Sequence, residues 1–192
     1  DEPMAIRALR RFAAEKAGTT PESPTAKPTG KKAAIVGSGP AGLTAAYYLA
    51  KLGHSPTVFE QFSKAGGMMR VGIPDYRLPE DILDAEIAEI QKVGVDIKLN
   101  TKIESIDGLF QQGYDAVFLG LGAHCGTRMG VEGEESPGVV DGASFLRKVN
   151  LGEKVDPGDE VAVIGGGNVA IDSARTALRL GTKKVTIIYR RT

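Results

Sequence analysis

The stretch that decides the fold is Ala33–Glu60, which reads AAIVGSGPAGLTAAYYLAKLGHSPTVFE. It opens with the apolar run Ala33–Val36, which is typical of a parallel strand buried on both faces. A glycine-rich turn follows, and then Leu43–Gly53, a segment of helical character that ends at a glycine. Pro56–Glu60 has the composition of a second strand. Strand, turn, helix and strand in this order predict a βαβ unit.

The turn in this unit has the form G-x-G-x-x-G, with glycines at Gly37, Gly39 and Gly42. The first glycine permits a sharp turn, the second lets backbone approach a diphosphate, and the third lets the helix lie against the strand. A diphosphate would then meet free N–H groups at the positive end of the helix. Glu60 ends the next strand, where a carboxylate accepts hydrogen bonds from ribose hydroxyls and repels a 2′-phosphate. Such an acidic end suits FAD or NAD, and the alternative is a structural turn followed by a surface glutamate.

A second copy of the pattern lies about 130 residues later, in the stretch VAVIGGGNVAIDSA, with the form G-x-G-x-x-A at Gly165, Gly167 and Ala170. The strand after it ends at Arg190 and Arg191 instead of at an acid. Guanidinium groups make forked, charge-assisted contacts with phosphate, so this copy favours NADP over NAD. The alternative is that the two arginines only hydrate the end of a strand. Two copies with opposite charge at the ribose position predict electron transfer from NADPH to FAD.

The rest of the chain alternates helical and strand patterns, which predicts an α/β fold. We divide it into an N-terminal helix and linker (1–30), the first part of an FAD-binding domain (31–156), and the beginning of an NADPH-binding domain (157–192). The further predicted elements are a helix at Met4–Ala17, a linker at Gly18–Gly30, a helix at Pro79–Gly94, strands at Val95–Ile103 and Tyr114–Ala123, and a helix at Asp141–Val149.

Composition excludes several classes of protein. Lys+Arg and Asp+Glu both number 24, so a basic protein that binds nucleic acid is not expected. The single cysteine, Cys125, cannot form an internal disulfide or an iron–sulfur site; we expect it to be a buried or half-buried thiol in a protein of the reducing cytoplasm. The apolar runs are too short to span a membrane, and the two histidines lack the spacing of metal ligands. No side-chain arrangement marks a catalytic residue.

Taken together, AAIVGSGPAGLTAAYYLAKLGHSPTVFEQFSKAGGMMRVGIPDYRLP, YDAVFLGLGA and VAVIGGGNVAIDSARTALRLG resemble a known family. They look like the small (beta) subunit of glutamate synthase, an NADPH-dependent FAD oxidoreductase, and the flavin-containing half of dihydropyrimidine dehydrogenase shares the pattern. The resemblance implies a three-layer, Rossmann-like FAD-binding domain into which an NAD(P)-binding Rossmann domain is inserted. It also implies that hydride from NADPH reaches the flavin. Electrons then leave singly for iron–sulfur clusters of a partner, the glutamate synthase large subunit or a similar protein.

The resemblance further implies which residues contact the cofactors. The FAD residues would be Gly37, Ser38, Gly39, Pro40, Ala41 and Gly42 at the diphosphate, Glu60 and Gln61 at the ribose, Gly66, Gly67 and Met68 near the ribityl and flavin region, Ile103 at the adenine, and Gly122 and Ala123 in a second glycine loop. The NADPH residues would be Gly165, Gly167, Asn168, Val169, Ala170, Arg190 and Arg191.

The chain departs from the family pattern at both ends. The cysteine-rich segment that precedes this region in the family is absent, as are the rest of the NADPH domain and the returning FAD segment. We therefore expect a fragment whose own NADPH-driven turnover is very low, and whose unpaired sheet edge favours a homodimer. The alternatives are a nucleotide-binding module without turnover, an electron-entry subunit with a different large subunit, and a one-site NAD dehydrogenase, which the duplicated turn opposes.

Overall fold

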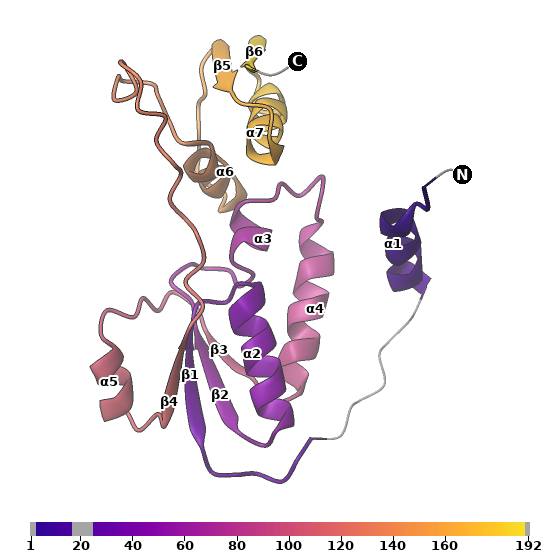
Figure 1. Ribbon diagram of the computed structural model, residues 1–192, viewed down its shortest axis with the longest axis vertical. Helices are drawn as coiled ribbons and strands as arrows, with labels where there is room; N and C mark the ends of the chain where they lie inside the picture. Colours follow the sequence, from indigo (N-terminus) through magenta and orange to yellow (C-terminus); the bar gives the residue numbers. More distant parts are fainter. Residues whose placement is uncertain (1–2, 17–24, 191–192) are drawn as a thin grey trace.

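The computed structural model describes residues 3–16 and 25–190. Residues 25–190 form two α/β units, and residues 3–16 contain a further helix that lies apart from them (Figure 1). The first unit has a four-stranded parallel sheet in the order β3-β2-β1-β4, and the second has the parallel pair β5-β6. The predicted α/β class is thus confirmed. The elements are α1 (Ile6–Lys16), β1 (Lys32–Val36), α2 (Pro40–Lys51), β2 (Ser55–Phe59), α3 (Met68–Val71), α4 (Glu80–Lys92), β3 (Asp96–Lys98), α5 (Ile106–Gln111), β4 (Ala116–Leu119), α6 (Gly142–Asn150), β5 (Glu160–Ile164), α7 (Asn168–Arg179) and β6 (Lys184–Ile188).

The sheet of the first unit is covered on both faces. Ala33 and Ile35 of β1 pack against Ala46 and Ala50 of α2, and residues of α4 complete that side. The alternate residues of β1 face the opposite side, in a cluster that contains Leu109 of α5. Figure 1 shows α2 and α4 together on one side of the sheet and α5 on the other. Because both faces of β1 are buried, its sequence has no polar alternation.

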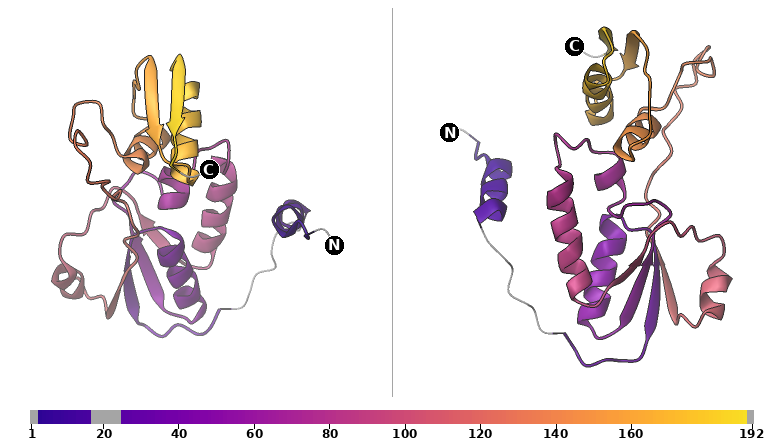
Figure 2. Two further views of the ribbon diagram at one scale, coloured as in Figure 1. Left: turned by 45° about the horizontal axis from the view of Figure 1, so that its top comes forward. Right: turned by 180° about the vertical axis from the view of Figure 1, so that it is seen from behind.

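The second unit has helices on one side of β5 and β6. Phe145 and Leu146 of α6 pack against Ala177 of α7, with Val161 and Val185 of the two strands beside them. Figure 2 shows the two strands side by side next to α7. Ile164, Ile187 and Ile188 of these two strands are exposed. The predicted boundary between the FAD-binding and NADPH-binding domains, at residue 156, stays a prediction, although α6 precedes this boundary and packs on α7. The predicted homodimer also stays a prediction.

Several predicted elements have different bounds in the structure. The predicted strand Val95–Ile103 shortens to β3, because Asn100 takes a positive φ of 53° and turns the chain out of the sheet. Ile103 therefore does not end a strand, contrary to our expectation; it packs against the core cluster on the α5 side. The sequence analysis also missed α5, although Ser105 caps it by accepting a hydrogen bond from the Gly108 N–H at 3.2 Å. The predicted helix Asp141–Val149 is present as α6, and Asp141 caps it by accepting a hydrogen bond from the Ser144 N–H at 2.8 Å.

The predicted N-terminal helix is present as α1, and its apolar side chains are exposed. Ile6, Leu9 and Phe12 have exposed fractions of 57%, 55% and 61%. Residues 18–24, most of the predicted linker Gly18–Gly30, lie outside the described residues, as does Ala17, the last residue of the predicted helix. Within the described residues, no helix combines the length and the apolar character that crossing a bilayer requires.

Asp115 joins the start of β1 to the start of β4, and its contacts make the stability of the fold depend on pH. Its Oδ1 accepts from Lys31 Nζ and its Oδ2 from the Lys32 N–H, each at 2.8 Å. The hydrogen bond from the Lys31 side chain, followed by that from the Lys32 backbone, lowers the pKa of Asp115. A carboxylate whose folded pKa is lowered stabilises the fold above its unfolded pKa, and this contribution is lost as pH falls through the folded pKa.

We therefore expect Asp115→Asn to flatten the loss of stability below about pH 4. Urea unfolding of variant and wild type at a series of pH values measures this. Parallel pH profiles for the two proteins would contradict the expectation.

Candidate functional site

The first glycine turn leaves β1 and enters α2 with a backbone that requires glycine. Gly37 has a φ of +102°, and a Cβ there would lie 2.4 Å from the carbonyl oxygen of Gly120. The Gly37 N–H donates to the Phe59 carbonyl at 2.8 Å, which continues the pairing of β1 with β2. Gly120, which follows β4, was not predicted. The G-x-G pattern of Gly120 and Gly122 after the strand could have indicated that Gly120 also lies close to the turn.

Gly42 allows the helix to cross the turn closely. A Cβ on Gly42 would lie 1.9 Å from the Gly37 carbonyl oxygen and 3.1 Å from Cγ2 of Ile35. Such distances are far below ordinary van der Waals contact, so no side chain fits there. The expected role of the third glycine, close packing of helix on strand, agrees with this geometry.

Gly39 is the residue at which the turn has free space. It is the N-cap of α2, with a φ of −71° and a ψ of 179°, and no side chain caps the helix. The nearest atom to a Cβ at Gly39 would be Cα of Gly67, at 3.9 Å. The protein itself therefore does not require glycine at this position. Pro40, the first residue of α2, has no N–H, so the N–H groups of Ala41 and Gly42 are the ones in the first turn that lack an acceptor within the helix, which fits a diphosphate.

A second glycine segment closes over the first. Gly67 has a φ of +53°, and a Cβ there would lie 2.5 Å from Cα of Gly39. Gly66 and Gly67 are both buried, and Met68 begins the short helix α3. The predicted FAD residues Gly37–Gly42 and Gly66–Met68, distant in sequence, are thus brought together.

Glu60 lies at the centre of this junction. Its exposed fraction is 4%, and its carboxylate accepts hydrogen bonds from the Ser38 N–H at 3.0 Å, the Ser38 hydroxyl at 2.5 Å and the Phe62 N–H at 2.9 Å. The Gly66 N–H in turn donates to Ser38 Oγ at 3.1 Å. An ionised carboxylate accepts about four hydrogen bonds, and the described residues supply three of them to Glu60. The sequence predicted only a ligand contact for Glu60, whereas in the structure Glu60 also holds the two glycine segments together through Ser38.

The other residues predicted for the first site lie further from this network. Gln61, Gly122 and Ala123 are exposed, and Gly122 has a φ of +68°. The structure places Gly120 against the turn instead: a Cβ there would be 3.2 Å from the Gly42 nitrogen.

The second glycine turn repeats the backbone of the first. Gly165 has a φ of +125°, and its N–H donates to the Ile188 carbonyl at 2.9 Å, as Gly37 donates to Phe59. Gly167 is the N-cap of α7 with a φ of −81° and a ψ of 176°, and a Cβ there would have no neighbour within 4 Å. Gly167 thus corresponds to Gly39, with the same conformation and the same open space. Asn168, Val169 and Ala170 form the first turn of α7.

The strand end after this turn differs from that of the first copy. Arg190 is exposed, and Arg191 lies outside the described residues. The ring of Tyr189 covers Gly166, since a Cβ there would lie 2.8 Å from two ring carbons. Gly166 was not predicted as a site residue, and its contact with Tyr189 explains why it is glycine.

The thiol of Cys125 and possible metal ligands are the remaining groups that could carry chemistry. Cys125 is exposed, so the expectation of a buried or half-buried thiol was wrong. Over residues 3–16 and 25–190, no group of three or more His, Cys, Asp or Glu could hold a metal ion.

Known proteins similar to this chain are oxidoreductases. The chain is 48% identical to the NADP(+)-dependent formate dehydrogenase subunit beta of Moorella thermoacetica, with 100% of the chain and 31% of the relative covered. It is 36% identical to the glutamate synthase [NADPH] small chain of Escherichia coli, with 98% and 43% covered. The chain therefore spans less than half the length of these relatives.

The fold also has solved counterparts. FprA of Mycobacterium tuberculosis superposes with a TM-score of 0.70 at 24% identity, over 84% of the chain and 44% of FprA. The profile of one family matches residues 31–192, which contain both glycine turns. The chain thus belongs to the pyridine nucleotide-disulphide oxidoreductase family.

Proposed function

We propose that this chain carries the two cofactor sites of an NADPH-dependent flavoprotein oxidoreductase, with FAD at the first glycine turn and NADPH at the second. The observation that carries the proposal is the pair of turns with the same backbone and opposite charge at the following strand end. Glu60 follows the first turn and Arg190 the second. Because carboxylates bind free ribose hydroxyls and guanidinium groups bind phosphate, the two sites would select different dinucleotides.

The residues at the first site would hold the diphosphate and the adenosine ribose of FAD. The open face of Gly39 lets the diphosphate approach the first turn of α2, whose dipole favours the negative charge. Glu60 keeps Ser38 and the Gly66–Gly67 segment in place and offers its remaining acceptor position to the ribose. When bound, FAD supplies the chemistry, accepting hydride and passing on electrons.

The residues at the second site would hold the diphosphate of NADPH at Gly167 and its 2′-phosphate at Arg190, with Arg191 as a further predicted contact. The two sites belong to units that touch each other, so the chain would position donor and acceptor together. A single cysteine cannot bind an iron–sulfur cluster, so the electrons would leave to clusters held elsewhere, as in a partner subunit. The same composition agrees with a cytoplasmic location.

Two partners are candidates. Glutamate synthase large subunit is the first, from the motifs quoted above and from the 36% identity to a glutamate synthase small chain. The second is the remainder of an NADP-dependent formate dehydrogenase, and the 48% identity to a beta subunit of that enzyme favours it. In both cases the role of this chain would be electron entry from NADPH.

The test measures cofactor binding to the purified chain. The change of FAD fluorescence on binding reports the affinity of the chain for FAD. We expect one FAD per chain, and binding of FMN at least about 100-fold weaker, because FMN lacks the second phosphate and the adenosine. Calorimetry with NADPH and NADH should then favour NADPH by at least about tenfold. A folded chain that binds neither FAD nor NADPH would overturn the proposal.

A further inference from the structure

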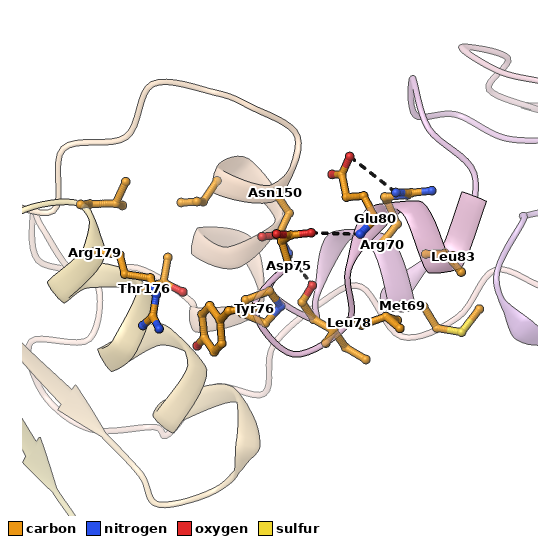
Figure 3. A pocket seen from close by; sticks show the side chains of 14 residues that line it. Met69, Arg70, Asp75, Tyr76, Leu78, Glu80, Leu83, Asn150, Thr176 and Arg179 are labelled. Atoms are coloured by element: carbon orange, nitrogen blue, oxygen red, sulfur yellow. Dashed lines mark hydrogen bonds and ion pairs between the residues drawn. The ribbon is translucent and has the colours of Figure 1, made fainter. Parts of the chain in front are cut away.

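We infer that the loop Ile73–Pro79 is a clamp that fixes the second unit on the first, and that Arg77 and Tyr76 are its positioning residues. The loop joins α3 to α4 in the first unit. Its side chains reach α7 of the second unit, as Figure 3 shows for Tyr76 beside Thr176 and Arg179. The geometry stands by itself, while its significance for hydride transfer rests on the proposed function.

The central contact is a buried carboxylate. Asp172 of α7 has an exposed fraction of 4%, and its Oδ2 forms an ion pair with Nη1 of Arg77. The Tyr76 hydroxyl lies 3.4 Å from Asp172 Oδ1 and 3.5 Å from its carbonyl oxygen. Within the described residues, the polar partners of this carboxylate are thus the two clamp side chains. Because an unpaired buried charge is strongly unfavourable, any register of the two units that buries Asp172 away from Arg77 and Tyr76 is disfavoured.

The ring of Tyr76 is held by two cations of the same helix. The guanidinium carbons of Arg175 and Arg179 lie 4.6 Å and 3.9 Å from the ring centroid. Residues three or four apart share one face of a helix, so Asp172, Arg175 and Arg179 present a single row to the loop. Cation–π contacts of this kind hold the ring in its orientation. The clamp therefore contacts about two turns of α7.

The clamp does not fill the whole interface. A cavity of about 260 Å³ lies between the units, lined by Met69, Leu78 and Leu83 on one side and by Val149, Thr176 and Arg179 on the other. Nη1 of Arg70 and Oγ1 of Thr176 are buried at its walls without a hydrogen-bond partner in the protein. Units joined by small, polar interfaces move relative to each other unless specific contacts prevent it. The clamp and the hydrogen bond from Asn150 Nδ2 to the Ile73 carbonyl, 3.2 Å long, supply such contacts.

The position of the clamp explains what it would control. Asp172 lies in α7 two residues after Ala170, the last residue of the second glycine turn. A helix is rigid over this distance, so fixing Asp172 fixes the direction of the turn and of any dinucleotide on it. Hydride transfer requires the reacting atoms at about 3–3.5 Å, and a displacement of about 1 Å slows it on the order of 100-fold. Arg77 and Tyr76 would thus position the nicotinamide without touching it.

The test measures the distance between the units without any cofactor. Spin labels are placed at Glu86→Cys on α4 and Lys183→Cys before β6, in a Cys125→Ser background, and the distance distribution is recorded by pulsed electron resonance. We expect a single narrow distribution for the parent protein, at least a twofold broader one for Arg77→Met, and a narrow one for the matched control Arg77→Lys, which keeps the charge. Asp172→Asn, which keeps the shape of the side chain, should broaden the distribution as Arg77→Met does.

An unchanged distribution in both Arg77→Met and Asp172→Asn would overturn the inference. If Arg77→Met does not fold, as judged by circular dichroism, Asp172→Asn alone decides. FAD binding is measured on the same variants, and we expect it to be retained because the first glycine turn is untouched. Loss of FAD binding in every protein, the parent included, would contradict the proposed function. The distance measurement would still decide whether the clamp fixes the two units.

Discussion

Gly39→Ala should weaken FAD binding on the order of 100-fold, about 2.7 kcal/mol, while the chain stays folded. The residue has a φ of −71°, which alanine adopts freely, and a Cβ there would approach no protein atom more closely than 3.9 Å. The added methyl would instead occupy the space in which a diphosphate meets the first turn of α2. Fluorescence titration with FAD measures the affinity, and urea unfolding measures the stability.

The second glycine turn supplies the matched control. Gly167 has the same conformation and the same open space, so Gly167→Ala should also fold. We expect it to bind FAD as the wild type does and to lose affinity for NADPH, and Gly39→Ala to do the reverse. If Gly39→Ala bound FAD with unchanged affinity, the diphosphate would not lie at this turn. If both variants lost both cofactors, the assignment of one cofactor to each turn would be wrong.

The two βαβ units could be predicted because their signals are local. An apolar run, a glycine turn and a helical segment follow one another within Ala33–Glu60, and no distant residue is needed to interpret them. The same holds for α6, where Asp141 caps the helix three residues before its hydrogen-bond donor. Local patterns also explain the failures. β3 ends early, at Lys98, and two residues later Asn100 takes a positive φ. The alternating pattern of apolar residues continues past Asn100 and gives no sign of this turn.

The contacts that complete the site could not be predicted, because they join segments that are distant in sequence. Ser38 stands at a variable position of its turn, and its importance appears only when β1 and β2 bring it to the carboxylate of Glu60. Gly120 likewise becomes part of the first turn only when β4 pairs with β1. Parallel strands end at one edge of a sheet, which places such residues together but does not specify their hydrogen bonds.

The contacts of the clamp were the hardest to predict, because they join the most distant segments of the sequence. Arg77 and Asp172 are 95 residues apart and belong to different units. A carboxylate in the first half of a helix is ordinarily interpreted as favourable charge near the helix N-terminus. Only the burial of Asp172 and the approach of the Ile73–Pro79 loop give it another role.

Gly42→Ala should destabilise the first unit by about 3 kcal/mol or more, although helix propensity predicts the opposite sign. Alanine in place of glycine inside a helix ordinarily stabilises it by about 0.5–1 kcal/mol. Here a Cβ would lie 1.9 Å from the carbonyl oxygen of Gly37 and 3.1 Å from Cγ2 of Ile35. Relieving this overlap requires α2 to move away from β1, which would open the core in which Ala46 and Ala50 pack on the sheet. Urea unfolding followed by circular dichroism measures the change.

Gly108→Ala separates this steric effect from propensity. Gly108 also lies in a helix, α5, but a Cβ there would lie 3.7 Å from its nearest neighbour, which is an ordinary contact. We expect Gly108→Ala to be neutral or slightly stabilising, so the two variants should change stability in opposite directions. Because the overlap also displaces Gly37, Gly42→Ala should lose FAD binding together with stability, whereas Gly39→Ala loses binding alone. If Gly42→Ala were as stable as the wild type, α2 would not cross the first turn as closely as the structure has it. The proposed diphosphate site at Gly39 depends on that close crossing and would then also be wrong.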